Sequence, residues 1–335
     1  MKIIRPIAEA DLDGLLHLAQ TAGTGFTSLP PVRSVLQRKI ERSLASFASS
    51  VQAPGLERYM FVLEDGERAE LLGCCAIEAA CGLDEPFYNY RVGLTVHASR
   101  RLQVYRRVPT LYLANDLTGA AVLCSLFLRR DARAAGLGQL LARSRFLFMA
   151  AHPQRFGSKV VAELRGISDE HGRSPFWDGL GRHFFSIDYD DAEHAVGRGN
   201  KAMIAELMPQ HPIYTVLLPE DAQAALGQVH PETAPALRLL EREGFRYQGY
   251  VDIFDAGPAV EAPLAEIVSV KHSRLISARE GGAKGLPHLI ATERLRDWRC
   301  VLGELDESTE APRLDAGMLD ALQLRSGELA RVACL

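Results

Sequence analysis

Residues 122–151 read VLCSLFLRRDARAAGLGQLLARSRFLFMAA. The apolar run 122–128 is short and bounded by charge, which predicts a buried strand. Apolar residues then recur at helical spacing until Pro153, which predicts a helix that ends there. Between strand and helix, Gly136 and Gly138 allow successive backbone N–H groups to converge at the positive end of the helix dipole. The unit therefore predicts a binding site for an anionic group, although an ordinary strand-to-helix turn would show the same glycine pair.

Composition and charge exclude several other classes of protein. The 335 residues suffice for two domains, or for one large domain with an appendix. Lys and Arg number 38 against 42 Asp and Glu, a net charge of −4, so no overall basic field is available for nucleic acid. No apolar run approaches the roughly 18 residues that span a bilayer. We therefore expect no nucleic-acid or membrane partner.

The six cysteines are expected to be reduced core residues of a cytoplasmic protein. They stand mostly in apolar runs and form no Cys-x-x-Cys pair. A zinc site is therefore not expected, and we predict neither a metal nor a tightly bound cofactor. Cys124 stands in the apolar strand of the 122–151 unit, which favours core packing over a role as a thiol nucleophile.

Strands and helices alternate on both sides of this unit. Strands are expected at 3–7, 59–63, 71–77, 87–96, 110–119 and 159–164, and helices at 12–19, 35–47 and 200–208. The two long β segments before residue 120 predict an extended hairpin beside the active cleft. Residues 174–185 and 233–247 both show a helix, a glycine turn and a strand start, which predicts an elaborated or partly duplicated second half.

A boundary is expected near 255–258, where Asp, Ala, Gly and Pro stand in succession. Beyond it we expect strands at 267–270, 275–278, 286–290, 298–302 and 324–332, with one helix at 315–322. This predicts a mixed α/β (α+β) chain of two domains, residues 1–256 and a small β-barrel-like domain at 257–335.

Several long runs resemble a known family. The loop from Arg133 to Gly138 resembles the acyl-CoA-binding motif of GNAT N-acyltransferases. A more specific resemblance, to the arginine N-succinyltransferase family, rests on FYNYRVG at 87–93, PTLYLAND at 109–116, VVAELRG at 160–166, SDEHGRSPFW at 168–177, GQVHP at 227–231 and YVDIFDAGP at 250–258. These runs cover nearly the full length of the chain.

The resemblance implies transfer of succinyl from succinyl-CoA to the α-amine of L-arginine, the first step of a catabolic route for arginine. Some members also accept ornithine, and some occur as two homologous subunits, so a homo-oligomer or hetero-oligomer is expected. Two alternatives stay open: an N-acyltransferase for ornithine or another amine, and a non-catalytic acyl-CoA-sensing subunit of the same fold.

The same resemblance implies roles for individual residues. It places succinyl-CoA at Leu126, where the backbone rather than the side chain would bind the acyl carbonyl. The glycine loop, with Arg133, Gly136, Leu137 and Gly138, would hold the pyrophosphate. His230 would be the proton donor in a direct attack of the amine on the thioester. From its place in a loop alone, His230 could equally be a surface residue that caps the following helix.

The substrates carry charges that must be paired. A guanidinium binds best to carboxylates, and the candidates are Asp116, Glu163, Asp169 and Glu170. The distal carboxylate of the succinyl group needs a cation, which Arg91 or Arg165 could supply. Each of these residues could instead belong to a structural ion pair.

Overall fold

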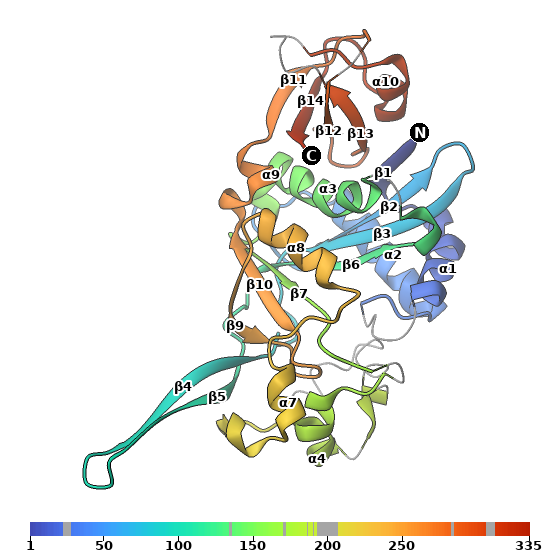
Figure 1. The fold of residues 1–335 in the computed structure, drawn as a ribbon. Helices are drawn as coiled ribbons and strands as arrows, with labels where there is room; N and C mark the ends of the chain where they lie inside the picture. The colour runs from blue at the N-terminus through green and yellow to red at the C-terminus, as the bar shows by residue number, and fades with distance from the viewer. Residues whose placement is uncertain are drawn as a thin grey trace.

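The computed structural model of the chain describes residues 1–22, 28–133, 136–169, 172–185, 187–189, 191–192, 207–282, 285–305 and 312–335. Its described strands form one mixed sheet in the order β11-β14-β12-β13-β1-β2-β3-β6-β7-β10-β9-β4-β5-β8 (Figure 1). The strands are β1 Lys2–Pro6, β2 Arg58–Asp65, β3 Glu70–Glu78, β4 Asn89–Ser99, β5 Val104–Ala114, β6 Ala121–Leu128, β7 Lys159–Glu163, β8 Ile213–Tyr214, β9 Arg246–Val251, β10 Pro258–Pro263, β11 Arg274–Ser277, β12 Leu286–Thr292, β13 Cys300–Leu305 and β14 Leu329–Cys334. The helices are α1 Leu12–Ala22, α2 Arg33–Ala48, α3 Leu137–Ala151, α4 Arg182–Phe185, α7 Glu220–Ala225, α8 Ala234–Arg242, α9 Val268–Lys271 and α10 Ala316–Leu322.

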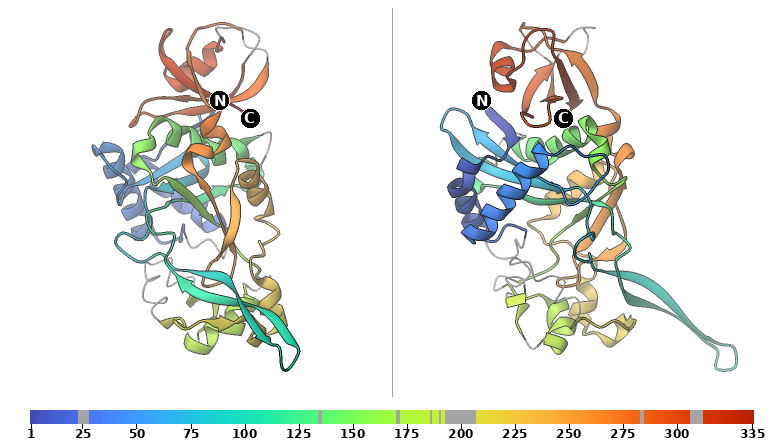
Figure 2. Two further views of the ribbon diagram at one scale, coloured as in Figure 1. Left: turned by 90° about the vertical axis from the view of Figure 1, so that its left-hand side faces the viewer. Right: turned by 180° about the vertical axis from the view of Figure 1, so that it is seen from behind.

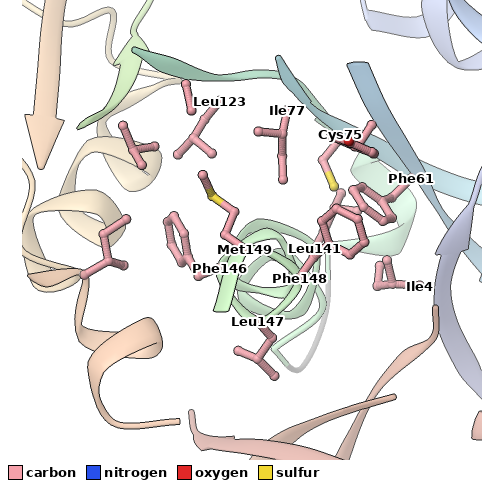
Figure 3. Packing of buried hydrophobic residues seen from close by; sticks show 14 of the residues in the cluster. Ile4, Phe61, Cys75, Ile77, Leu123, Leu141, Phe146, Leu147, Phe148 and Met149 are labelled. Carbon is pink, nitrogen blue, oxygen red and sulfur yellow. The ribbon is translucent and has the colours of Figure 1, made fainter. Parts of the chain in front are cut away.

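Helix α3 is the centre of the main core, as Figure 3 shows. It begins directly after Gly136, whose φ of 85° is favourable for glycine, and it ends before Pro153. Phe146 and Phe148 are fully buried and pack against side chains from one face of the sheet, Phe61 among them. The predicted strand, turn and helix of residues 122–151 are thus confirmed.

Helices α1 and α2 cover the opposite face of the sheet. Side chains alternate between the faces of a strand, and in β2 Phe61 packs on the α3 side while Met60 and Val62 pack with α1 and α2. Figure 2 shows these helices and α3 on the two sides of the sheet. Each strand of this region is therefore covered on both faces, which explains the nearly continuous apolar runs of the sequence.

Strands β6 and β7 are parallel but pair only briefly. The register joins Ala121 to Val160 and Val122 to Val161, and no further pairs of these two strands occur in the described residues. Strand β6 nevertheless continues to Leu128 beside β3, and β7 continues beside β10. The edge of β6 that faces β7 is therefore open from residue 123 onward.

The extended hairpin is also confirmed. Strands β4 and β5 pair along their full length, from Asn89↔Ala114 to Ser99↔Val104. The hairpin projects from the rest of the chain as an arm (Figures 1 and 2). Its far part carries apolar side chains that are largely exposed, such as Tyr105.

Most of the other predicted strands and helices are present with shifted ends. The β-rich C-terminal region is a row of four antiparallel strands with α10 beside it, and β13 connects the row to the large sheet through Ile4↔Cys300. The division into two domains stays a prediction. Because β10 pairs with both β7 and β9, a boundary would lie after Pro263 rather than at 256–257.

Two predictions about local structure were wrong. Residues 174–185 form no glycine turn and strand, because a π-helical turn at Trp177–Gly181 continues directly into α4. The glycines of this segment allow close packing instead, because a Cβ on Gly181 would lie 2.4 Å from the Trp177 ring. Of the two supposed repeats, only 233–247 has the expected form, with α8 followed by β9. Residues 268–271 are the helix α9 rather than a strand, and most of the helix predicted at 200–208 lies outside the described residues.

Replacing Gly257 should destabilise the fold near the end of β7. A Cβ there would lie 2.0 Å from the Leu164 carbonyl oxygen and 2.5 Å from the Gly166 nitrogen. We expect Gly257→Ala to lower the free energy of unfolding by about 1–3 kcal/mol, the usual cost of overpacking. Thermal unfolding measures this. Gly282→Ala is the control, because no atom of the described residues lies within 4 Å of its Cβ position. Equal melting temperatures for the two variants would contradict the prediction.

Candidate active site

The open edge of β6 carries a distorted backbone. Ser125 has a φ of 52°, a left-handed conformation that is uncommon for serine, and the β3–β6 register shifts at this point. The Ser125 hydroxyl donates to the Ser28 carbonyl (3.1 Å), and the Ser125 N–H donates to the Ser28 hydroxyl (3.2 Å). The side chain of Leu126 is half-buried and packs against the main core. The backbone is therefore the part of Leu126 that could contribute to a site.

The glycine turn stands at the end of the same strand. Gly138 is exposed, and among the described residues a Cβ there would meet only the Leu128 side chain, at 3.9 Å. Arg133 is exposed, while Gly136 and Leu137 are half-buried. The first N–H groups of a helix have no partner within the helix, so this end of α3 offers donors next to an exposed arginine. The arrangement suits a phosphate-type anion.

His230 lies on the β6 side of the chain that continues β7. The backbone N–H of Leu164 donates to the Pro258 carbonyl, and that of Gly166 donates to the Asp255 carboxylate. Both N–H groups therefore point to the β10 side. Successive residues of a strand direct their backbone groups to alternate edges, and the Arg165 carbonyl therefore points toward β6. It accepts the His230 N–H at 2.8 Å. The loop of His230 is thus held in the gap where β6 and β7 separate.

The imidazole of His230 has a defined tautomer. The Glu232 N–H donates to its Nδ1 at 3.2 Å, so the proton of the neutral ring is on Nε2. Desolvation by burial lowers the pKa of His230, and the charge of Arg165 lowers it further. The contact with Glu232 stabilises the turn before α8 rather than capping the helix itself, whose N-cap Thr233 makes no side-chain cap hydrogen bond. It leaves Nε2–H available to another group.

Arg165 stands beside His230. Its Nη2 donates to the Ser168 hydroxyl at 2.7 Å. Its Nε is buried and has no hydrogen-bond partner in the part of the chain that the structure describes. The turn that holds it is fixed by Asp255, which accepts from Gly166 N (2.6 Å) and Gly257 N (2.7 Å). A buried charged donor without a partner is rare in proteins and indicates a missing ligand or water.

Two of the predicted carboxylates lie along one face of the sheet. Glu163, at the end of β7, accepts from the Asn89 amide at 2.8 Å. Asp116, after β5, accepts from the Tyr250 hydroxyl at 3.0 Å. A row of cross-strand neighbours connects the two: Glu163, Ala259, Tyr250, Arg91 and Tyr112. The sequence-predicted residues Glu163, Asp116 and Arg91 are thereby brought to one surface.

The other predicted residues are placed differently. Arg91 stacks over Tyr112, with 5.7 Å from its Cζ to the ring centroid. It lies three strands from Glu163 in the sheet order, although Asn89 on the same strand bonds to Glu163. Asp169 accepts the Arg173 N–H at 2.8 Å and so stabilises its own loop. Glu170 lies outside the described residues.

Sequence reasoning missed Arg58, at the start of β2. It is 8% exposed, and its Nη1 forms an ion pair with Glu78 at 2.9 Å. Its Nη2 lies 3.4 Å from the Sγ of Cys124 on β6. Cys124 is therefore half-buried against a cation, not simply packed in the core. The signal in the sequence was an arginine directly before the apolar run 59–63, which places a charge at the start of a buried strand.

Burial raises the pKa of the thiols of Cys75 and Cys81 to about 12. Such thiols are poor nucleophiles at neutral pH. Among the described residues, no group of three or more His, Cys, Asp or Glu side chains is placed to hold a metal ion. Within the same residues no helix is long and apolar enough to cross a membrane.

Comparisons with known proteins agree over the whole chain. The family model for the arginine N-succinyltransferase beta subunit matches residues 2–269, and that for its C-terminal domain matches 272–333. The arginine N-succinyltransferases of Salmonella paratyphi B and Salmonella newport are each 48% identical over 338 residues, spanning 100% of this chain and 98% of theirs.

A solved structure supports the same conclusion. Subunit AI of the arginine/ornithine succinyltransferase from Pseudomonas aeruginosa matches with a TM-score of 0.93 and 40% identity, covering 100% of this chain and 98% of that one. The mixed α/β fold predicted from the sequence is thereby confirmed. The chain belongs to the arginine N-succinyltransferase family.

Proposed function

We propose that the protein transfers the succinyl group of succinyl-CoA to the α-amine of L-arginine. The observation that carries the proposal is the gap between β6 and β7, which has an open backbone edge on one side and His230 with Arg165 on the other. The family relationship supports the choice of substrates. A cytoplasmic location, and assembly with another copy or with a homologous subunit, belong to the same proposal.

Succinyl-CoA would bind along β6 and the start of α3. The pyrophosphate would lie on the N–H groups of the turn, with Arg133, Gly136, Leu137 and Gly138 around it. The thioester carbonyl would accept from the backbone at Leu126, on the open edge of β6. This arrangement gives a partner to strand N–H groups that β7 does not reach, and the same donors would stabilise the oxyanion as it develops.

The reaction needs no covalent intermediate, because both substrates can bind together. The uncharged α-amine attacks the thioester carbon, and the C–S bond breaks as the tetrahedral intermediate collapses. His230 would pass its Nε2 proton to the departing sulfur in the same step in which the attacking nitrogen gives its proton to Nε2, because the neutral ring cannot lose its only proton by itself. The ring therefore stays neutral, and CoA leaves as a thiol. The contact of Glu232 N–H with Nδ1 orients the ring for this exchange.

Arginine would be held at its two charged ends. Arg165 is beside His230 and has a free buried Nε, which suits the α-carboxylate next to the reacting amine. Glu163 and Asp116, along the face of the sheet, suit the guanidinium; Asp169 and Glu170 remain weaker candidates. Arg91 lies on β4, four strands from β6 in the sheet order, and its guanidinium stacks over Tyr112, which makes it a weaker candidate for the succinyl carboxylate.

A thiol-release assay tests the function directly. Succinyl-CoA and acetyl-CoA are each offered with arginine, ornithine and lysine. We expect the highest kcat/KM for succinyl-CoA with arginine. Release with ornithine but not arginine would favour the alternative amine acyltransferase, and no release with any pair would favour an acyl-CoA-sensing subunit.

A bulky residue at Gly138 should block the pyrophosphate site. Gly138→Val adds a branched side chain where backbone and anion would meet, yet the fold has room for a Cβ there. We expect the Kd for CoA, measured by calorimetry, to rise at least about tenfold, with unchanged circular dichroism. Unaltered CoA affinity in the folded variant would remove this loop from the site.

Loss of His230 should impair the chemical step more than binding. A general acid acts in the transition state, so His230→Ala should lower kcat by about 10²–10⁴-fold, the usual range for one proton-transfer group. His230→Gln retains hydrogen bonding but cannot exchange a proton, and it should fare no better. Succinyl-CoA binding should change little in both. A kcat within about threefold of wild type would leave His230 with only its structural role before α8.

Arg165 should discriminate arginine from agmatine, which lacks the α-carboxylate. We expect Arg165→Met to reduce the preference for arginine over agmatine by at least about tenfold, since a charge-assisted contact contributes on the order of 1.5–3 kcal/mol. The KM for succinyl-CoA serves as internal control and should stay within about threefold. A preference equal to that of the wild type would exclude Arg165 from carboxylate binding.

A further inference from the structure

One side of the Arg58 guanidinium, next to β6, lacks a strong hydrogen-bond partner among the described residues. Its Nη1 is paired with Glu78, but its Nε is buried and has no hydrogen-bond partner among the described residues. The Nε and Nη2 atoms form the side of a guanidinium that binds a carboxylate through two parallel hydrogen bonds. Along that side Arg58 has only the weak contact of Nη2 with the Cys124 sulfur, at 3.4 Å.

A second cation, Lys39, belongs to the same cluster. It lies on α2, is half-buried, and forms no hydrogen bond or ion pair with any described residue. Burial, and after it the positive charge of Arg58, lower the pKa of Lys39 to about 8. Glu78 is the one acid whose charge acts on both residues. Two cations against one carboxylate leave this cluster with a surplus of positive charge.

The cluster is positioned relative to the acyl-CoA site by the sheet. Arg58 pairs with Glu78 across β2 and β3, and Glu78 pairs with Val122 of β6. Cys124, which touches Arg58, is followed directly by the distorted Ser125 and by Leu126 on the open edge. The cations therefore lie on the β2–β3 side of β6, while His230 and Arg165 lie on its β7 side.

We infer that Arg58 and Lys39 bind the distal carboxylate of the succinyl group and so select succinyl-CoA over uncharged acyl-CoA. This inference rests on the proposed function, in which the thioester lies at Leu126. Two methylene groups connect that carbonyl to the distal carboxylate, and the chain would run past Cys124. The ligand carboxylate would supply the hydrogen-bond partner that the Arg58 Nε lacks and the counter-charge that Lys39 lacks. The two carboxylates of the substrate pair would thus be bound on opposite sides of β6.

The test compares succinyl-CoA with butyryl-CoA, which has the same carbon chain without the carboxylate. The readout is the ratio of their kcat/KM values with arginine. We expect Lys39→Met and Arg58→Lys each to reduce this ratio at least about tenfold, while kcat/KM for butyryl-CoA stays within about threefold. Arg58→Lys retains the positive charge but removes the two parallel donors, Nε and Nη2, that would bind the carboxylate. Arg38→Met is the matched control, because it removes a cation from the exposed side of the same helix, and its ratio should equal that of the wild type.

Thermal unfolding completes the test. Lys39 has no partner within the described chain, so Lys39→Met should melt at the wild-type temperature or higher, and this variant decides the question if Arg58→Lys does not fold. Loss of folding in Lys39→Met would show an internal structural role and overturn the inference. If the wild type uses succinyl-CoA, an unchanged ratio of kcat/KM for succinyl-CoA and butyryl-CoA in both variants would also overturn the inference. A wild type inactive with succinyl-CoA would instead refute the proposed function itself.

Discussion

The parallel ladder between β6 and β7 ends after Val122↔Val161, and the rest of the site depends on this short pairing. Backbone N–H and C=O groups seldom remain buried without partners. A strand that leaves its neighbour must therefore offer its free edge to water, to another segment or to a ligand. Here the segment of His230 bonds to the β7 side of the gap through the Arg165 carbonyl. The β6 side is left for the acyl carbonyl in the proposed complex.

The two sides of the gap are held by different parts of the fold. Strand β6 is fixed by β3 and by the packing of Leu123 and Leu141 in the core around α3. The β7 side is fixed by the Asp255 carboxylate, which accepts two backbone N–H groups. Neither support depends on pairing between β6 and β7 beyond Val122↔Val161, so in the proposed complex a substrate could bind between them without breaking either support. The proposed site would then be organised before the ligand binds, which would reduce the entropy lost on binding.

The sequence predicted those features that depend on local pattern. The strand, glycine turn and helix of 122–151 were predictable because each depends on a local residue pattern. The strand needs a short apolar run, the turn needs glycine for its positive φ, and the helix needs apolar residues at helical spacing. The ending at 233–247 was predictable for the same reason. Residues 174–185 show a similar pattern but remain helical, because Gly179 and Gly181 provide room for close packing rather than a turn. Local patterns do not distinguish these two uses of glycine.

The pairing of charges was not predictable. Arg58 reaches Cys124 across 66 positions of sequence, and Asn89 reaches Glu163 across 74. Only the strand order, with β3 between β2 and β6, brings such residues together. In the same order Arg91 stands four strands from β6, although on sequence alone it was as good a candidate as Arg165. The order of the strands in the whole sheet thus decides which cations have an acidic partner and which do not.

The most direct test of this binding mode is a crystal structure with a ketone analogue of succinyl-CoA, in which a methylene group replaces the thioester sulfur so that the acyl group cannot be transferred. We expect the acyl carbonyl oxygen at hydrogen-bond distance, about 2.7–3.2 Å, from a backbone N–H on the open edge of β6 at Leu126. We also expect the pyrophosphate on the turn at Gly136 and Gly138. An analogue bound elsewhere, or bound with its acyl group away from the gap between β6 and β7, would contradict the proposed binding mode.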